Sequence, residues 1–372
     1  MTRQGYFPIL DPLRFLASLC VFLAHSVVFF KVPVASLSFN DLIKDAGYYG
    51  VIFFFVLSGF LITWLLLREK KATGTIALRR FYIRRVLRIW PLYYLIVGLS
   101  FFVFPHLIHG HPAAGIGNWG WPFLLYALFL PNIVPFTGFY LATCFHTYTI
   151  GYEEQFYLFW PLILRRAGRY LRYALAGLFL LPVLLEIVHG WLMTHGYALP
   201  GRWDGLVRET LDFIPAFIAG AIAAFLYLEG SDRLRVFIGK KIWRYGLIAL
   251  IGSLMWFIIP GRTGYSGMVS LLFAFLILHL VQSDAGVGRI GMLLARGGKI
   301  SYGIYIYHAA VLIGVSLFMT RMHIAIAGWP LLTYLIYLLL SFVLLLLTAA
   351  ASYRYFEKFF LRKKERWRTG GV

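Results

Sequence analysis

Arg14 and His25 are the first residues whose type and spacing could support chemistry, because both lie in the apolar stretch "ILDPLRFLASLCVFLAH". An ionisable side chain at the centre of a membrane costs about 3 kcal/mol on insertion scales. On a helix, residues eleven positions apart point the same way and lie about 16 Å apart along the axis. One helix face would then carry a fixed cation at one end and an imidazole near the other. The alternative is that Arg14 reaches the membrane surface and His25 is a hydrogen-bonded packing residue.

Glu153 and Glu154 are adjacent carboxylates in a second apolar stretch, "TYTIGYEEQFYLFWP". We expect Glu153 at about the membrane depth of His25, roughly 9 Å below the outer surface. A carboxylate beside an imidazole orients the ring and stabilises its protonated form, as in hydrolase triads. Adjacent helical residues diverge by about 100°, so only one of the two glutamates can face a given partner. The alternative is that Glu153 only hydrogen-bonds to a neighbouring helix.

Arginines are concentrated in the stretch "RRFYIRRVLRIWPLYY". Arg85 and Arg88 are three residues apart and share a helix face. Arg88 adjoins the apolar run, at the membrane level expected for Arg14. A polyanionic ligand such as a nucleotide phosphate would suit this convergence of guanidinium groups. The alternative is that these arginines contact anionic lipids and set the orientation of the chain in the membrane.

Other polar residues in apolar stretches are expected to line a cavity or to stabilise the bundle. Tyr305 and His308 are three residues apart and could share the face of a cavity. Ser58 precedes Gly59 in an aromatic stretch, where small residues permit close helix approach, so packing is the favoured interpretation there. The residues assigned to this group are Asp11, Ser58, Ser301, Tyr305 and His308.

Composition indicates a polytopic membrane protein, since 60% of the 372 residues are hydrophobic and only 13% are charged. The formal charge of +20 does not indicate nucleic-acid binding, because the Lys and Arg residues lie in short clusters between apolar runs. Cys20 and Cys144 fit no metal or disulfide spacing and are expected to pack. No metal site and no nucleic-acid partner are predicted.

Ten apolar runs have spanning length, and an eleventh, 121–134, is short and contains prolines at both ends. The links between these runs, with the C-terminal tail, form two alternating sets, one with 27 Lys plus Arg residues and the other with five. Ten crossings would place every link of the basic set on the cytoplasmic side, as the positive-inside rule requires. We therefore predict an all-α bundle of about ten transmembrane helices as one domain over 1–372, with both termini cytoplasmic and 121–134 re-entrant or interfacial. The ten runs lie near 9–30, 47–67, 89–105, 147–164, 173–190, 208–228, 244–260, 264–283, 300–320 and 329–352.

Stretches between residues 10 and 360 together resemble the acyltransferase 3 family of integral membrane O-acyltransferases. "LDPLRFLASLCVFLAH" is similar to the family's opening "LDGLRGLAALLVVLFH", including the spacing from Arg14 to His25. "GVIFFFVLSGFLIT" and "FYIRRVLRIWPLYY" resemble "GVDLFFVLSGFLIT" and "FYxRRxLRIxPLYY". "YTIGYEEQFYLFWPLIL" resembles "WSLSVEEQFYLLWPLLL", which places the family's glutamate at Glu153. "ISYGIYIYH" and "SYRYFEKFF" resemble "ISYSLYLWH" and "SYxxxExPF".

The chain departs from the family pattern at several positions. Pro12 and Phe15 replace two glycines, Ile52 replaces an acidic residue, Tyr148 replaces a tryptophan and Phe359 replaces a proline. The loss of the acid at Ile52 puts any role for that position in doubt, and the other changes could reshape the acceptor pocket. The extracytoplasmic hydrolase-like domain that is often appended in the family has no counterpart in this sequence.

The resemblance implies transfer of an acyl group, commonly acetyl from cytoplasmic acetyl-CoA, to a hydroxyl group. Arg14, Arg85 and Arg88 would hold the coenzyme A phosphates, His25 would act as general base or carry the acyl group, and Glu153 would orient it. Acceptors in the family include envelope polysaccharide, lipopolysaccharide O-antigen, peptidoglycan and glycosylated small molecules. Expected partners are acyl-CoA, a glycan, lipid-linked glycan or glycosylated small molecule, membrane lipids and, as an open alternative, a second copy. The expected location is the bacterial cytoplasmic (inner) membrane.

Two other classes compete with an enzyme. A multi-pass transporter or flippase of envelope-glycan intermediates would also use buried His, Glu and Arg residues. We find no internal repeat that would support a carrier. A structural membrane subunit of a glycan-assembly complex would leave Arg14, His25 and Glu153 unexplained.

Overall fold

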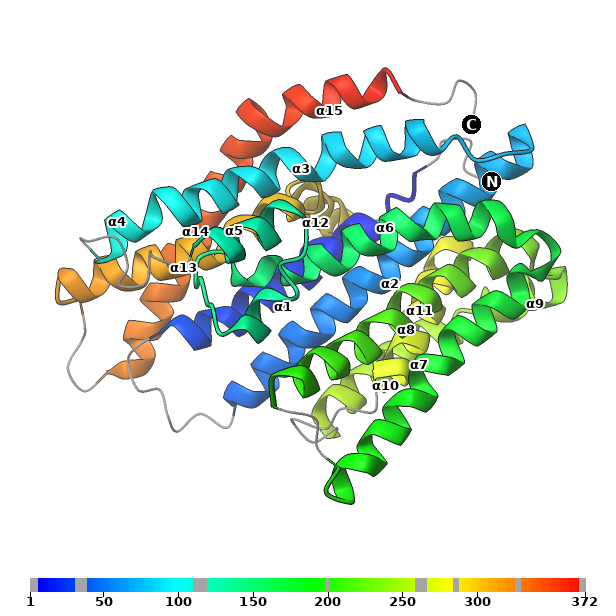
Figure 1. Cartoon of the computed structure of the whole chain (residues 1–372), viewed down its shortest axis with the longest axis horizontal. Coiled ribbons are helices and arrows are strands. Elements are labelled where there is room, and N and C mark those ends of the chain that lie inside the picture. Colours follow the sequence, from blue (N-terminus) through cyan, green and yellow to red (C-terminus); the bar gives the residue numbers. More distant parts are fainter. Residues whose placement is uncertain are drawn as a thin grey trace.

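The computed structural model describes residues 6–30, 39–109, 119–197, 201–257, 266–283, 288–324 and 329–367. Within these ranges every regular element is helical, which confirms the all-α prediction (Figure 1). The α-helices are α1 (Leu10–Phe29), α2 (Phe39–Thr73), α3 (Leu78–Phe102), α4 (Phe104–His109), α5 (Gly120–Ala127), α6 (Tyr148–Ala167), α7 (Leu171–Thr194), α8 (Gly201–Glu229), α9 (Asp232–Ile238), α10 (Ile242–Phe257), α11 (Ser266–Gln282), α12 (Arg289–Lys299), α13 (Ser301–Arg321), α14 (Pro330–Ser352) and α15 (Lys358–Glu365). Short 3₁₀ helices are η2 (Val134–Thr137), η3 (Phe145–Thr147) and η4 (Gly168–Tyr170), and η5 (Tyr353–Glu357) is a π-helical turn.

Each of the ten apolar runs expected from the sequence contains one of these helices. By length and composition, seven helical stretches of the described chain could cross a membrane. One of the seven, Phe145–Thr194, contains both α6 and α7, and α11 is a shorter apolar helix. The chain is therefore an integral membrane protein with several candidate spans.

The run 121–134 forms only the eight-residue helix α5, followed by turns and η2. Eight helical residues extend about 12 Å, well short of the roughly 30 Å hydrocarbon core of a bilayer. This run therefore does not form a spanning helix, in agreement with the sequence analysis.

Two helical boundaries differ from expectation. The third apolar run was expected to begin at residue 89, but α3 begins at Leu78 and includes the arginine-rich segment. Arginine is a good helix former, so the helix extends beyond the apolar run. At the other end, α14 continues through η5 into α15, where a basic tail was expected.

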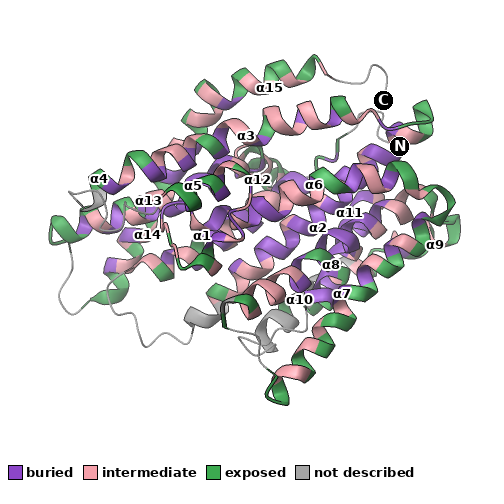
Figure 2. Ribbon diagram, viewed as in Figure 1, coloured by how far each residue is buried: buried purple, intermediate pink, exposed green. Residues whose placement is uncertain are grey.

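The centre of the bundle is the contact between α2 and α8. In the most apolar window of Ile43–Thr73, 78% of residues are buried within the protein, against 22% in Phe145–Thr194. A Cβ atom at Gly59 would lie 1.9 Å from the carbonyl oxygen of Phe217, and one at Gly220 would lie 1.9 Å from that of Val56. Reciprocal glycines thus allow the two backbones to touch, as the Ser58–Gly59 pair indicated. Figure 2 shows the buried residues concentrated along these inner helices.

Helix α1 packs against α2, α12 and α13 (Figure 1). Its beginning is fixed by α12, because a Cβ atom at Gly298 would lie 2.3 Å from the Asp11 carbonyl oxygen. Its later turns pack along α13, which begins only two residues after α12 ends. This arrangement sets the Arg14 end of α1 beside α12 and the His25 end beside α13.

Candidate active site

Three histidines from three separate elements meet beside α1. The Nδ1 atom of His25 in α1 lies 2.9 Å from the Nε2 atom of His308 in α13, within hydrogen-bonding distance. The ring of His146 in η3 packs on His308 with ring centroids 4.4 Å apart. His146 and His308 are each only 1% exposed. In the described part of the chain these residues do not form a set of ligands that could hold a metal ion.

Tyr305 joins this histidine cluster to α6. Its hydroxyl donates to the backbone carbonyl of His146 at 2.9 Å and also contacts the hydroxyl of Thr149. His308 Nδ1 lies 2.5 Å from the Tyr305 carbonyl oxygen. His308 is therefore the residue of this pair that contacts His25, while Tyr305 connects α13 to His146 and to Thr149 of α6.

The expected pair between His25 and Glu153 is not formed among the described residues. The Glu153 carboxylate instead accepts a hydrogen bond of 2.8 Å from the Ser58 hydroxyl of α2. Tyr157 donates to Ser58 at 3.0 Å, so a chain of three polar groups links α6 to α2. His25 takes His308 as its partner because α13, rather than α6, packs directly along this part of α1.

The two adjacent glutamates diverge as the helical geometry requires. Glu154 accepts a hydrogen bond of 3.1 Å from the Trp90 indole of α3, while Glu153 faces α2. Of the two, Glu153 is the glutamate that contacts α2.

Arg88 is the arginine that connects the other two residues of the predicted cation cluster. Arg14 is within electrostatic range of Arg88, although the two residues belong to different helices, and Arg85 is within range of Arg88 and Glu153. The Arg14 side chain is 15% exposed and its guanidinium contacts the Asp11 carboxylate at 2.5 Å. Arg88 is thus within electrostatic range of both Arg14 and Arg85, and Asp11 is bonded to Arg14.

Asp11 holds Arg14 in place and is itself held by Tyr6. The Tyr6 hydroxyl donates to the Asp11 carboxylate. Burial and this hydrogen bond raise the pKa of Tyr6 to about 12, so the hydroxyl keeps its proton at neutral pH. Asp11 is therefore a structural partner of Arg14 in this structure.

Arg84 and Lys364 join the same cluster, and the sequence analysis did not assign either to the site. Arg84 is 8% exposed, and its Nε and Nη2 atoms form no hydrogen bond with the described residues. Lys364 of α15 lies within electrostatic range of Arg84, Arg85 and Arg88. This proximity depends on the packing of α15 along α3, as Figure 1 shows, and no local sequence pattern indicates this packing.

The Ser301 side chain hydrogen-bonds to the backbone and not to the histidine cluster. Its hydroxyl donates to the Gly298 carbonyl at 2.9 Å, at the junction of α12 and α13.

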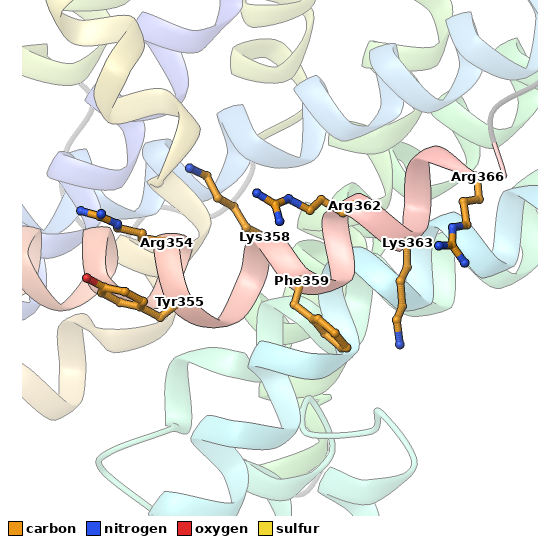
Figure 3. A pocket seen from close by; sticks show the side chains of 7 residues that line it. All are labelled: Arg354, Tyr355, Lys358, Phe359, Arg362, Lys363 and Arg366. Carbon is orange, nitrogen blue, oxygen red and sulfur yellow. The ribbon is translucent and has the colours of Figure 1, made fainter.

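A shallow groove of about 340 Å³ lies elsewhere, along η5 and α15 (Figure 3). It is lined by Arg354, Tyr355, Lys358, Phe359, Arg362, Lys363 and Arg366, so no predicted site residue contributes to it.

His146 is the residue of the histidine cluster that the sequence analysis missed. It lies seven positions before Glu153, a spacing that would equal two turns of a continuous α-helix, and this was the available signal. The predicted span began one residue after it, and η3 rather than regular α-helix carries it.

Comparison with known proteins identifies relatives along nearly the whole chain. Residues 7–353 match the model of a family described as "Acyltransferase domain". The chain is 28% identical, over all of its length and 60% of the relative's, to a Staphylococcus aureus (strain MRSA252) protein named "Putative O-acetyltransferase SAR0937". It is 26% identical to O-acetyltransferase OatA of S. aureus (strain NCTC 8325 / PS 47), covering 96% of this chain and 57% of the relative. The chain thus spans about three fifths of these relatives, and no solved structure matches it.

Proposed function

The chain belongs to the acyltransferase family whose domain model matches residues 7–353, and from this membership we propose that it is a membrane O-acetyltransferase. It would move an acetyl group from cytoplasmic acetyl-CoA to a hydroxyl of a glycan or glycoconjugate at the outer face of the membrane. Relatives named O-acetyltransferases support the reaction. The acceptor class rests on the family resemblance of the sequence motifs.

The observation that carries this proposal is that α1 connects a cation cluster to an imidazole. Arg14 lies at one end of α1 within electrostatic range of Arg88, which is also within range of Arg85, and His25 lies about 16 Å further along the helix. This separation suits acetyl-CoA, whose phosphates would be bound by the arginines and whose pantetheine arm would extend toward His25. Guanidinium groups bind phosphate through paired donors, so an arginine cluster suits the phosphate end of such a donor.

His25 would act as the general base. It would take the proton of the acceptor hydroxyl while the hydroxyl oxygen attacks the thioester carbonyl. The carbon–sulfur bond would then break, and the departing thiolate would take the proton from His25 to give coenzyme A. In the alternative route, the same nitrogen of His25 would carry the acetyl group as a short-lived acetyl-histidine. The burial of His308 and His146 beside His25 would help to exclude water from the thioester.

Glu153 would serve the donor rather than His25. It is within electrostatic range of Arg85 and Arg88 and is hydrogen-bonded to Ser58. A carboxylate in this place would balance the arginine charges when the site is empty and fix their orientation. Tyr305 and Ser58 would line the passage between the cations and the histidine cluster.

The membrane arrangement that fits this function has ten crossings and both termini in the cytoplasm. Helices at all ten predicted runs, and the short α5 in the eleventh, support it. The basic links would then lie in the cytoplasm, as the positive-inside rule requires. We place the protein in a bacterial cytoplasmic membrane, with α5 and the following turns re-entrant or interfacial from the outer side.

Mass spectrometry of envelope glycans and lipid-linked glycans tests the function and names the acceptor. Cells would express the wild-type chain, His25→Ala, or His195→Ala as a matched control at an exposed histidine outside the site. We expect a mass gain of one acetyl group with the wild type and His195→Ala, and none with His25→Ala. A gain that persists in His25→Ala would reject His25 as the base. No gain in any strain would favour a small-molecule acceptor or a glycan carrier.

A further inference from the structure

We propose that His308 is a positioning residue that fixes the tautomer of His25, so that the Nε2 lone pair of His25 faces the substrate. The proposal rests on the proposed function of His25 as general base, and it deepens that function by assigning each ring proton. It replaces the triad carboxylate expected at Glu153 with a neutral imidazole.

The first step concerns the proton on His308. Its Nδ1 atom lies 2.5 Å from the backbone carbonyl oxygen of Tyr305, one turn earlier in α13. A carbonyl oxygen can only accept a hydrogen bond, so Nδ1 of His308 must carry the proton. His308 is 1% exposed, and no carboxylate of the described chain is hydrogen-bonded to it, so burial favours the neutral ring. In a neutral ring with a proton on Nδ1, Nε2 is an acceptor.

The second step transfers this constraint to His25. The two facing nitrogens, His25 Nδ1 and His308 Nε2, are 2.9 Å apart. Because His308 Nε2 is an acceptor, His25 Nδ1 must be the donor. In a neutral ring this leaves the lone pair of His25 on Nε2.

The consequence for the reaction is a defined proton path. His25 Nε2 takes the proton of the acceptor hydroxyl, while the Nδ1 proton stays between His25 and His308. The imidazolium that forms keeps its hydrogen bond to the His308 lone pair, as an imidazolium keeps its bond to the carboxylate in a triad. When the thiolate departs, the proton on Nε2 passes to sulfur, and both rings return to their starting tautomers.

His146 is held by the same helix in a similar manner. Its Nε2 atom lies 3.1 Å from the Ile306 carbonyl, so Nε2 carries the proton. Consecutive carbonyls of α13, those of Tyr305 and Ile306, thus set the protons of His308 and His146. The ring of His146 packs against His308 and restricts its rotation.

A matched pair of variants separates this role from packing. His308→Gln keeps an oxygen that can accept from His25, whereas His308→Leu has similar bulk and no acceptor. Membranes containing each variant would be supplied with radiolabelled acetyl-CoA, and label incorporated into membrane glycans would be measured over a range of acetyl-CoA concentrations. We expect His308→Leu to lose kcat about 100-fold and His308→Gln to retain most of it. The KM for acetyl-CoA should change less than about twofold in both, because the arginine cluster is untouched.

A Leu variant as active as the Gln variant or the wild type would overturn the proposal. Inactive wild-type membranes would instead contradict the proposed function and leave the tautomer open to a direct test. That test also serves if the variants fail to fold: ¹⁵N-histidine NMR of the detergent-solubilised wild type, with His25 identified by its loss in His25→Gln. A protonated Nδ1 and an unprotonated Nε2 at His25 support the proposal, and the opposite tautomer overturns it.

Discussion

His308 Nε2 lies 2.9 Å from His25 Nδ1, although 283 positions separate the two residues in the chain. This contact joins the first helix to one of the last and forms the centre of the candidate active site. At the other end of α1, Arg14 contacts Asp11 and lies within electrostatic range of Arg88. A single helix therefore carries one residue of each half of the site.

Replacement of Arg88 should weaken binding of the donor. Arg88 lies within electrostatic range of Arg14, Arg85 and Lys364, so its guanidinium is the common neighbour of the cluster. Loss of a charge-assisted hydrogen bond of about 1.5–3 kcal/mol should raise the KM for acetyl-CoA about tenfold or more in Arg88→Ala, with kcat little changed. Steady-state kinetics with membranes measures this, and Arg166→Ala is the control at an exposed arginine. An unchanged KM would place the coenzyme elsewhere.

A side chain at Gly59 should destabilise the bundle. A Cβ atom there would lie 1.9 Å from the Phe217 carbonyl, so α2 and α8 would have to separate. We expect Gly59→Ala to lower stability by about 1–3 kcal/mol, seen as a lower melting temperature in detergent. Gly98→Ala is the matched control in α3, where a Cβ atom has no neighbour within 4 Å. Equal melting temperatures for the two variants would contradict the close α2–α8 packing.

Ser58 and Glu153 should act together. The Ser58 hydroxyl donates to the Glu153 carboxylate at 2.8 Å, so removing either residue leaves the other without this hydrogen bond. In a double-mutant cycle of Ser58→Ala and Glu153→Gln, we expect a coupling energy of about 0.5–3 kcal/mol in stability or activity. Ser26→Ala offers a control, since Ser26 contacts the Tyr334 hydroxyl and shares no hydrogen bond with Glu153. Additive effects in the first pair would show that the contact carries no energy.

The orientation of α5 and its neighbouring loops can be tested with reporters. Because 121–134 forms no spanning helix, positions 111 and 137 should lie on the same, outer side of the membrane. Residue 111 lies outside the described ranges, so this prediction rests on the charge bias for that position. Cysteine accessibility at both positions, compared with position 241, which we expect in the cytoplasm, shows on which side of the membrane each position lies. Opposite accessibility at 111 and 137 would contradict the ten-crossing arrangement.

Features that depend on one helix were predictable from the sequence. The spacing of Arg14 and His25 places both on one face of α1, and the divergence of Glu153 and Glu154 follows from helical rotation alone. Close packing at Gly59 was indicated by the small-residue pair.

Features that depend on which helices are neighbours were not predictable. The partner of His25 was expected to be Glu153, but two residues at a similar expected depth need not belong to adjacent helices. His146 lies in a 3₁₀ turn just before α6, where no apolar periodicity marks it. Lys364 reaches the arginines only because η5 and α15 turn back along α3.

Acetyl-CoA hydrolysis by the purified protein tests the central claim most directly. The wild-type chain, even without its acceptor, should slowly release acetate and coenzyme A, because His25 can activate water in place of the acceptor hydroxyl. His25→Ala should abolish this release while melting at the same temperature as the wild type. Release by wild type alone is the predicted result. Equal release by both proteins, or none by a folded wild type, would contradict an acyltransferase in which His25 is the base.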